Sequence, residues 1–269
     1  LKVTPAHDMN DYELGRRHNL EVIDILNEDG TLNAKAKIFV GEDRFVARKR
    51  IAKELEVKNF LSKVEDYKSN VGFSERTDAV IEPRLSLQWF LKMKDITKPA
   101  LEHVMNDNIQ LIPPKFKNTY NHWMSNVRDW CISRQLWWGH RLPMYTCDQC
   151  NHVHCEEKAP IKCDKCGHDK LTQDPDALDT WASSWLWPFG VHNWANPSEQ
   201  EKLDLEYYYP TNVIVTGADI IFFWIARMVM AGEYFTGETP FKHCYFTPIV
   251  RDSRGRKMSK SLGNSPDVA

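Results

Sequence analysis

Two Cys-x-x-Cys motifs separated by twelve residues constrain this chain more than any other feature, and their cysteines are Cys147, Cys150, Cys163 and Cys166. Each motif can form a tight knuckle that directs two thiolates toward one tetrahedral ion. Asn151 and Gly167 directly follow the knuckles, where a left-handed backbone conformation is often required. Because four protein ligands leave no open position for water, we predict a structural zinc site within residues 147–172.

Other interpretations of this segment stay open. The cysteines could be reduced thiols, or the remnant of a knuckle that has lost its metal. Four more potential ligands lie in the same segment and could replace a cysteine: His152, His154, Cys155 and His168. The total of seven cysteines is odd, which favours metal ligation in a reducing compartment such as the cytoplasm over a disulfide framework. Cys131 and Cys244 have apolar neighbours and are predicted to be core residues.

Charge and hydropathy exclude several classes of protein. The chain has 35 lysine and arginine residues against 37 aspartate and glutamate residues, a formal net charge of −2, so it is neither a polybasic nucleic-acid coat nor an acidic tail. The longest apolar run, 220–226, is far shorter than the ~20 residues that cross a bilayer. The first residues also lack the pattern of a signal peptide. We therefore predict a folded protein with no membrane partner.

The chain is expected to be an internal piece of a longer α/β protein. Residues 1–4 alternate like a strand already under way, and the last residues are typical of a turn. Residues 1–88 are predicted to belong to a small α/β domain, with a strand over 21–26 and a helix over 43–55. The helix is indicated by apolar residues at helical spacing, namely Phe45, Val46, Ile51 and Leu55.

The rest of the chain divides into three segments. Residues 89–146 have a helical, aromatic pattern broken at Pro113-Pro114, and are predicted to lead into a second core. The Cys-rich insertion, 147–172, follows. Residues 173–269 are predicted to hold a βα unit, and its elements are a buried strand over 213–215, a helix from Asp219 to about Ala231 and a further strand over 243–250.

A basic loop near the end of the chain carries four cations, Arg254, Arg256, Lys257 and Lys260. On composition alone, such a loop is most often simply solvated. Two lysines three residues apart, with hydroxyl residues beside them, could also wrap a polyphosphate and stabilise a departing pyrophosphate. The sequence Lys-Met-Ser-Lys-Ser over 257–261 resembles the signature loop of class I aminoacyl-tRNA synthetases.

The resemblance extends along nearly the whole chain and favours the valine-specific members of that family. Matching segments occur in the family's order, at 129–135 (DWCISRQ), 138–141 (WGHR), 178–181 (LDTW) and 216–224 (TGADIIFFW). Isoleucyl and leucyl members share the plan but differ in these segments. Thr247-Pro248 departs from the more usual His-Gly, and the chain has no His-x-Gly-His motif, the family's partner signature for ATP.

The resemblance implies the second half of a Rossmann-like catalytic domain with a zinc knuckle insertion, preceded by the end of an editing domain. It implies that Lys257, Ser259 and Lys260 are catalytic and that the two lysines bind ATP. Asp219 would bind the α-ammonium of valine. The walls of the valine pocket would be Trp181, Ile220 and Trp224. Without the resemblance, these three residues would be interpreted as ordinary core.

A valine pocket cannot strongly exclude threonine, so the family hydrolyses threonyl-tRNA at a second site. Residues 2–13 resemble part of that editing site, and the resemblance assigns to it Lys2, Thr4, Asp8 and Asp11. Asp11 would hold the amino group of the misattached threonine. The alternative is a helix start, with Thr4 as N-cap and Pro5 at the first helical position.

The resemblance further implies a monomeric cytoplasmic enzyme whose substrates are valine, tRNA(Val) and ATP with magnesium. The isolated chain should be inactive, because it supplies only one side of the ATP site. Two other interpretations remain: an isoleucyl or leucyl relative, and a non-catalytic zinc-ribbon module in which the basic loop grips RNA phosphates.

Overall fold

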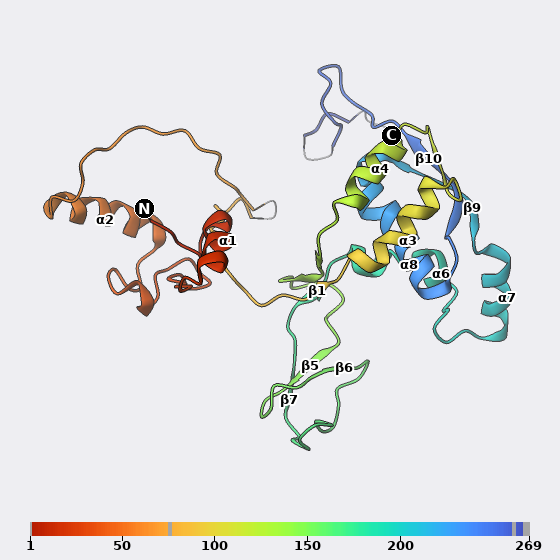
Figure 1. Ribbon diagram of the computed structural model, residues 1–269, viewed down its shortest axis with the longest axis horizontal. Helices are drawn as coiled ribbons and strands as arrows, with labels where there is room; N and C mark the ends of the chain where they lie inside the picture. Colours follow the sequence, from red (N-terminus) through yellow and green to blue (C-terminus); the bar gives the residue numbers. More distant parts are fainter. Residues whose placement is uncertain (1, 75–76, 260–261, 266–269) are drawn as a thin grey trace. The chain divides into compact units, whose positions relative to one another are not determined.

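The computed structural model describes residues 2–74, 77–259 and 262–265, and the chain divides into two compact units, 1–87 and 88–269. No helix in these described ranges has both the length and the apolar character that a membrane crossing needs. Figure 1 shows the helices and strands of each unit.

The described residues of the first unit form two α-helices and one 3-10 turn: α1 (Met9–His18), η1 (Ala34–Ala36) and α2 (Arg44–Val57). Its small core consists of Leu26, Leu32 and Ala47. The predicted helix over 43–55 is confirmed as α2, which begins after Asp43 because this carboxylate accepts a hydrogen bond from the N–H of Phe45.

Two expectations for this unit are wrong. Residues 21–26 are extended but form no strand, since their pairing is limited to a single bridge between Leu26 and Leu32. Residues 2–4 likewise form no strand. The apolar residues of α2 also remain largely exposed, namely Phe45, Val46, Ile51 and Leu55. Their spacing indicates a helix correctly, but no described element packs on that side of it.

The second unit is built on a parallel sheet of three strands, which are β2 (Gln110–Ile112), β10 (Phe241–Thr247) and β9 (Thr211–Gly217) in that spatial order. The central strand, β10, pairs Tyr245 with Ile112 on one side and with Val215 on the other. The expected strands over 213–215 and 243–250 are confirmed in β9 and β10, the latter ending at Thr247.

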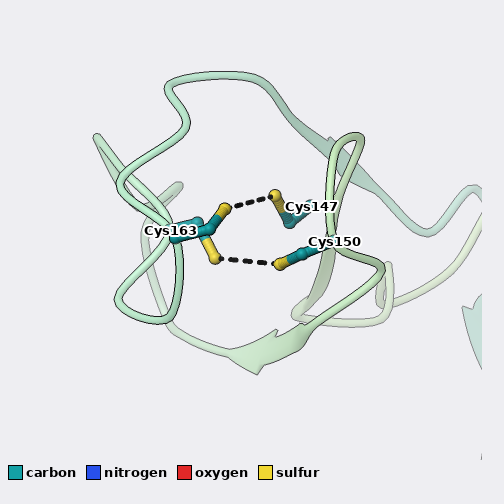
Figure 2. Close-up of side chains that lie close together, drawn as sticks. Cys147, Cys150 and Cys163 are labelled. Carbon is teal, nitrogen blue, oxygen red and sulfur yellow. Dashed lines mark hydrogen bonds between the residues drawn. The ribbon is translucent and has the colours of Figure 1, made fainter.

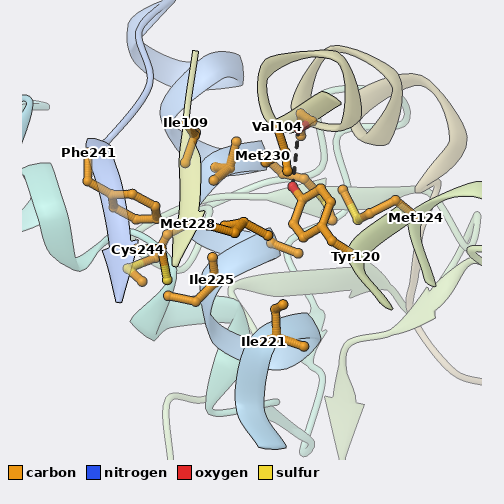
Figure 3. Close-up of a cluster of buried hydrophobic side chains, with 14 of the residues drawn as sticks. Val104, Ile109, Tyr120, Met124, Ile221, Ile225, Met228, Met230, Phe241 and Cys244 are labelled. Carbon is orange, nitrogen blue, oxygen red and sulfur yellow. Dashed lines mark hydrogen bonds between the residues drawn. The ribbon is translucent and has the colours of Figure 1, made fainter. Parts of the chain in front are cut away.

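Three helices pack together on the sheet: α3 (Lys94–Met105), α4 (Phe116–Ser125) and α8 (Arg227–Thr236). Figure 3 shows the core between them, where Tyr120 of α4 points toward α3 and donates a hydrogen bond to the carbonyl of Ala100 at 3.1 Å. Burial raises the pKa of Tyr120. Cys244 of β10 is fully buried in this core, as predicted, and burial raises its pKa to about 12.

Only one face of the sheet is covered by the described helices. Cys244 and Phe246 face the core, whereas the alternating positions are open to solvent, with Val213 53%, Val215 61% and Tyr245 48% exposed. The prediction of a fully buried strand over 213–215 is therefore wrong. Burial on both faces requires helices on both faces, and the described part of the chain supplies them on one.

The connection from β9 to β10 is mostly helical, and its helical part consists of η2 (Ala218–Ile220), the π-helical turn η3 (Ile221–Ala226) and α8. The helical part ends before Gly237, which has a φ of 72°. The predicted βα unit is confirmed, with the helix continuing five residues past the expected end at Ala231. The π-helical turn lies just after Asp219, and such turns are frequent at functional sites.

The Cys-rich insertion contains a small antiparallel sheet with β5 (Met144–Cys147) in the centre, between β6 (Val153–Cys155) and β7 (Leu171–Gln173). Two further ladders pair β1 (Phe90–Leu91) with β3 (Trp130–Cys131), and β4 (Ser133–Arg134) with β8 (Ala177–Leu178). The remaining helices are α5 (Trp181–Ser184), α6 (Trp187–Gly190) and α7 (Glu199–Tyr208).

Candidate functional site

Asp219 and Lys257 meet beyond the carboxyl end of β9, where open α/β sheets bind ligands. The ammonium of Lys257 donates a hydrogen bond to Oδ2 of Asp219 at 2.7 Å, and this bond lowers the pKa of Asp219 against the opposing effect of desolvation. Gly217 permits the turn, because a Cβ there would lie 2.7 Å from Oδ1 of Asp219. Two residues separated by 38 positions are thus joined into one charged pair.

Aromatic rings gather on α5 and η3, and η3 begins two residues after Asp219. Trp181 is 5.9 Å from Trp224 and 6.0 Å from Phe223 between ring centroids. Trp181 and Trp224 are half-buried and pack on the main core, and Ile220 is half-buried beside Asp219. The three residues assigned to the valine pocket therefore combine core contacts with partial exposure, which leaves both the pocket and the core interpretation physically sound.

Asp252 joins separate parts of the basic loop through hydrogen bonds. Its carboxylate accepts hydrogen bonds from the guanidinium of Arg256 and from the amide of Asn264, and the Asn264 bond contributes most to lowering its pKa. Asn264 in turn accepts a hydrogen bond from the N–H of Ser259 at 2.9 Å. Lys260, one of the residues assigned to catalysis, lies outside the described residues.

A cavity of about 430 Å³ opens beyond the carboxyl ends of all three parallel strands. Ala218 follows β9, Thr247 ends β10, and Lys115 lies shortly after β2; Pro248 and Arg251 also line it. Two cations at this edge suit a phosphate-bearing ligand. Sequence reasoning missed Lys115 and Arg251, since isolated basic residues give no signal until the strand ends converge.

Arg227 was also missed by sequence reasoning. It is 3% exposed, its guanidinium stacks 3.3 Å from the ring centroid of Trp130, and burial lowers its pKa to about 10 although Asp179 opposes the shift. It lines a second cavity of about 360 Å³. A single arginine in a nearly all-apolar helix is the signal that could have identified it.

The four cysteines converge as predicted. Figure 2 shows Cys147 and Cys150 facing Cys163 across the knuckle, and the Sγ–Sγ distances are 3.6 Å for both Cys150–Cys163 and Cys147–Cys166. Four sulfurs at about 2.3 Å from a tetrahedral zinc would lie roughly 3.8 Å apart. The residues directly after the two knuckles have the predicted left-handed conformation, with φ of 55° at Asn151 and 76° at Gly167. This donor set fits zinc.

The thiols influence each other's ionisation. Desolvation opposes ionisation of Cys163, but the neighbouring imidazole of His154 and hydrogen bonds from backbone N–H groups outweigh it and lower the pKa to about 6. The pKa of Cys166 is raised to about 12, because desolvation and the neighbouring sulfurs outweigh a backbone hydrogen bond. A divalent cation at their centre would remove this conflict between adjacent thiolates.

In the first unit, Thr4 and Asp11 are joined directly. Oδ2 of Asp11 accepts hydrogen bonds from the N–H of Thr4 at 2.7 Å and from its hydroxyl at 3.1 Å. Asp8 is the N-cap of α1 and accepts from the N–H groups of Asn10 and Asp11, so the alternative of Thr4 as N-cap is wrong. Asp8 is the N-cap because its carboxylate reaches the N–H groups of the second and third helical residues. Lys2 is exposed.

Comparison with known families assigns the chain to a class. The family described as tRNA synthetases class I (I, L, M and V) matches residues 19–269, and the chain belongs to it. A valine–tRNA ligase from Parabacteroides distasonis is 58% identical to this chain over 275 residues, and one from Clostridium acetobutylicum is 50% identical over 267 residues. The predicted resemblance to valine-specific synthetases is confirmed.

The chain spans less than a third of those relatives. Each alignment covers 99% of the chain, but 31% of the Parabacteroides protein and 30% of the Clostridium protein. Among solved structures, the ternary complex of Agrobacterium radiobacter K84 agnB2 LeuRS with tRNA and LeuAMS has a TM-score of 0.44 and 25% identity, covering 52% of this chain and 22% of that chain.

Proposed function

We propose that this chain provides one half of the site at which a synthetase attaches valine to tRNA(Val). The observation that carries the proposal is the Asp219–Lys257 pair, at 2.7 Å, whose aspartate is followed one helical turn later by Trp224, a ring packed near Trp181 to form an aromatic wall. The carboxylate offers a partner for an α-ammonium, and the wall offers an apolar surface for a small branched side chain.

The contact of Lys257 with Asp219 supports a mechanism in which the α-ammonium of valine replaces the ammonium of Lys257 on this carboxylate. The Lys257 ammonium now occupies the position on Asp219 that the α-ammonium of valine would take. When valine binds Asp219, Lys257 is released toward the phosphates of ATP, which is bound as its magnesium complex in the cavity lined by Lys115 and Arg251. The valine carboxylate then attacks the α-phosphate, and pyrophosphate leaves while the cations of Lys257 and Lys260 stabilise its charge.

The acyl group subsequently passes to the terminal ribose of tRNA. No protein nucleophile is required, because positioning and charge stabilisation account for the rate. Zinc held by the four cysteines would supply no chemistry to this reaction and would stabilise the knuckle. We further propose that the protein acts as a monomer in the cytoplasm, where its seven free cysteines would remain reduced.

The test is a chimera in which this chain replaces the matching third of the Parabacteroides distasonis ligase. Pyrophosphate exchange should depend on valine and be much weaker with isoleucine or leucine, whereas the isolated chain should give no exchange. Exchange that prefers isoleucine or leucine would assign the chain to another branch. Exchange by the isolated chain, or salt-sensitive RNA binding by a chimera that folds and shows no amino-acid dependence, would contradict the proposal.

Editing gives a second prediction. Replacing Asp11 by asparagine in the chimera keeps the shape of the Thr4 contact but removes the charge proposed to hold the threonyl ammonium. Hydrolysis of threonyl-tRNA should fall by about tenfold or more, since a hydrogen bond to a charged group contributes about 1.5–3 kcal/mol. Valine activation should not change.

Glu13→Gln is the matched control for this editing experiment, because Glu13 lies on the same helix and pairs with Arg16 at the surface. It should leave both reactions unchanged. If Asp11→Asn lowered hydrolysis and activation equally, Asp11 would be a folding residue, and its assignment to editing would be wrong.

A further inference from the structure

The knuckle carries a second group of potential metal ligands, which is separate from the four cysteines and consists of His152, His154 and Asp164. The Nε2 atom of His152 lies 3.3 Å from Oδ1 of Asp164, and the Nε2 atom of His154 lies 3.5 Å from the same oxygen. All three ligand atoms lie within 4.8 Å of one another. We call this group the His-Asp cluster.

The buried nitrogen of His154 is the decisive atom of the cluster. His154 is only 7% exposed, and its Nε2 atom is inaccessible to solvent and has no hydrogen-bond partner among the residues that the structure describes. The 3.5 Å separation from Asp164 is too long for a hydrogen bond. Leaving a buried polar atom without a hydrogen-bond partner costs about 1–3 kcal/mol. A ligand bound by Nε2 of His154 would remove this cost.

The fold of the knuckle explains why these side chains converge. His154 is the central residue of β6, and it points inward while its neighbours Val153 and Cys155 are exposed. His152 follows the left-handed residue of the first Cys-x-x-Cys turn, and Asp164 lies inside the second. The interactions that join the two Cys-x-x-Cys turns therefore also bring the three residues of the His-Asp cluster together. The imidazole rings of the two histidines are nearly perpendicular, with centroids 4.9 Å apart.

We propose that the His-Asp cluster binds a second zinc ion, distinct from the one assigned to the cysteines. Ligand atoms at about 2.0–2.1 Å from a tetrahedral zinc lie roughly 3.3–3.4 Å apart, which matches the two observed distances to Asp164. Two imidazoles and one carboxylate suit zinc better than magnesium or calcium, which prefer oxygen ligands.

The proposed site has an open position. Three protein ligands leave the fourth corner of a tetrahedron for water, and the side chain of Asp164 is 71% exposed, so this corner faces solvent. The cysteine site is closed by its four ligands. The knuckle would therefore contain two zinc sites, one closed by four cysteines and one with a coordination position open to water.

Cobalt and zinc titrations of the metal-free full chain test the proposal. Cobalt bound to the cysteines produces an intense thiolate-to-metal charge-transfer band, whereas cobalt bound to imidazole and carboxylate does not. The first equivalent of Co²⁺ should produce this band, and a second should bind without increasing it. Equilibrium dialysis against Zn²⁺ followed by metal analysis should give two ions per chain.

Two variants locate the second ion. Asp164→Asn and His154→Ala should each reduce zinc from two ions per chain to one and weaken the second binding step about tenfold or more, because loss of even an outer-shell partner weakens metal binding roughly 10–100-fold. The charge-transfer band should persist. Asp169→Asn and His168→Ala are the matched controls, since they change the same residue types elsewhere in the knuckle, and they should retain two ions.

Asp164→Asn decides the result if His154→Ala disturbs folding, because the Asp164 side chain is mostly exposed. The proposal is overturned if the wild-type chain binds a single ion at saturating zinc. It is equally overturned if Asp164→Asn binds the second ion with unchanged affinity, or if the controls lose it to the same extent.

Discussion

Replacing Asp219 by alanine in the chimeric ligase should lower kcat/KM for valine-dependent pyrophosphate exchange by about 10–100-fold. The α-ammonium of valine would then enter the site without its carboxylate partner, and a hydrogen bond to a charged group contributes about 1.5–3 kcal/mol. The released Lys257 would add to the loss, since two cations would face the same space. Steady-state exchange at varied valine concentration measures the effect.

Two further variants separate charge from shape at this position. Asp219→Asn keeps the side-chain volume but should lose nearly as much activity, because an amide cannot neutralise the ammonium. Gly217→Ala should cause a smaller loss with Asp219 intact, since the new Cβ would lie 2.7 Å from the present position of Oδ1. Unchanged valine-dependent exchange in the Asp219→Ala variant would remove this residue from the mechanism.

Replacing Cys163 by serine should release the structural zinc and unfold the knuckle while leaving the main core intact. Structural zinc sites contribute apparent binding free energies of about 10–16 kcal/mol, and this energy becomes folding energy for the segment they close. The zinc content should fall by two ions per chain, because the unfolded knuckle would no longer hold the His-Asp cluster together either. Hydrogen exchange should accelerate over β5, β6 and β7 but not over β10, whose contacts lie in the main core.

Cys155→Ser is the control for Cys163→Ser, because Cys155 is an exposed thiol outside the cysteine site. It should keep the metal and the slow exchange of the knuckle. Wild-type protein prepared without chelator that contains almost no zinc would contradict the assignment, and the vestigial-knuckle interpretation would then hold.

Local features of this protein were predictable from sequence, because their causes lie within a few residues. The left-handed conformations at Asn151 and Gly167 follow from the geometry of a Cys-x-x-Cys turn. The start of α2 follows from a capping aspartate, Asp43. The convergence of the four cysteines could also be predicted, since metal-ligand spacing encodes a shared centre.

Features that depend on distant neighbours were not predictable in the same way. Helical spacing in α2 indicated the helix but not its exposure, because burial depends on what packs against it. The pairing of Lys257 with Asp219 requires the basic loop to fold back over the end of β9. The extra ligands of the knuckle were visible as residues near a metal site, but their separation into a second cluster depends on the inward direction of His154 on β6.

The uncovered face of the parallel sheet has a consequence for handling the protein in solution. Val213, Val215 and Tyr245 form an apolar surface, and among the described strands β9 pairs its backbone on one side only. Such a surface favours reversible self-association as concentration rises. Light scattering across a dilution series should therefore set the working range before any metal titration, so that ions trapped between stacked chains are not counted as bound to one.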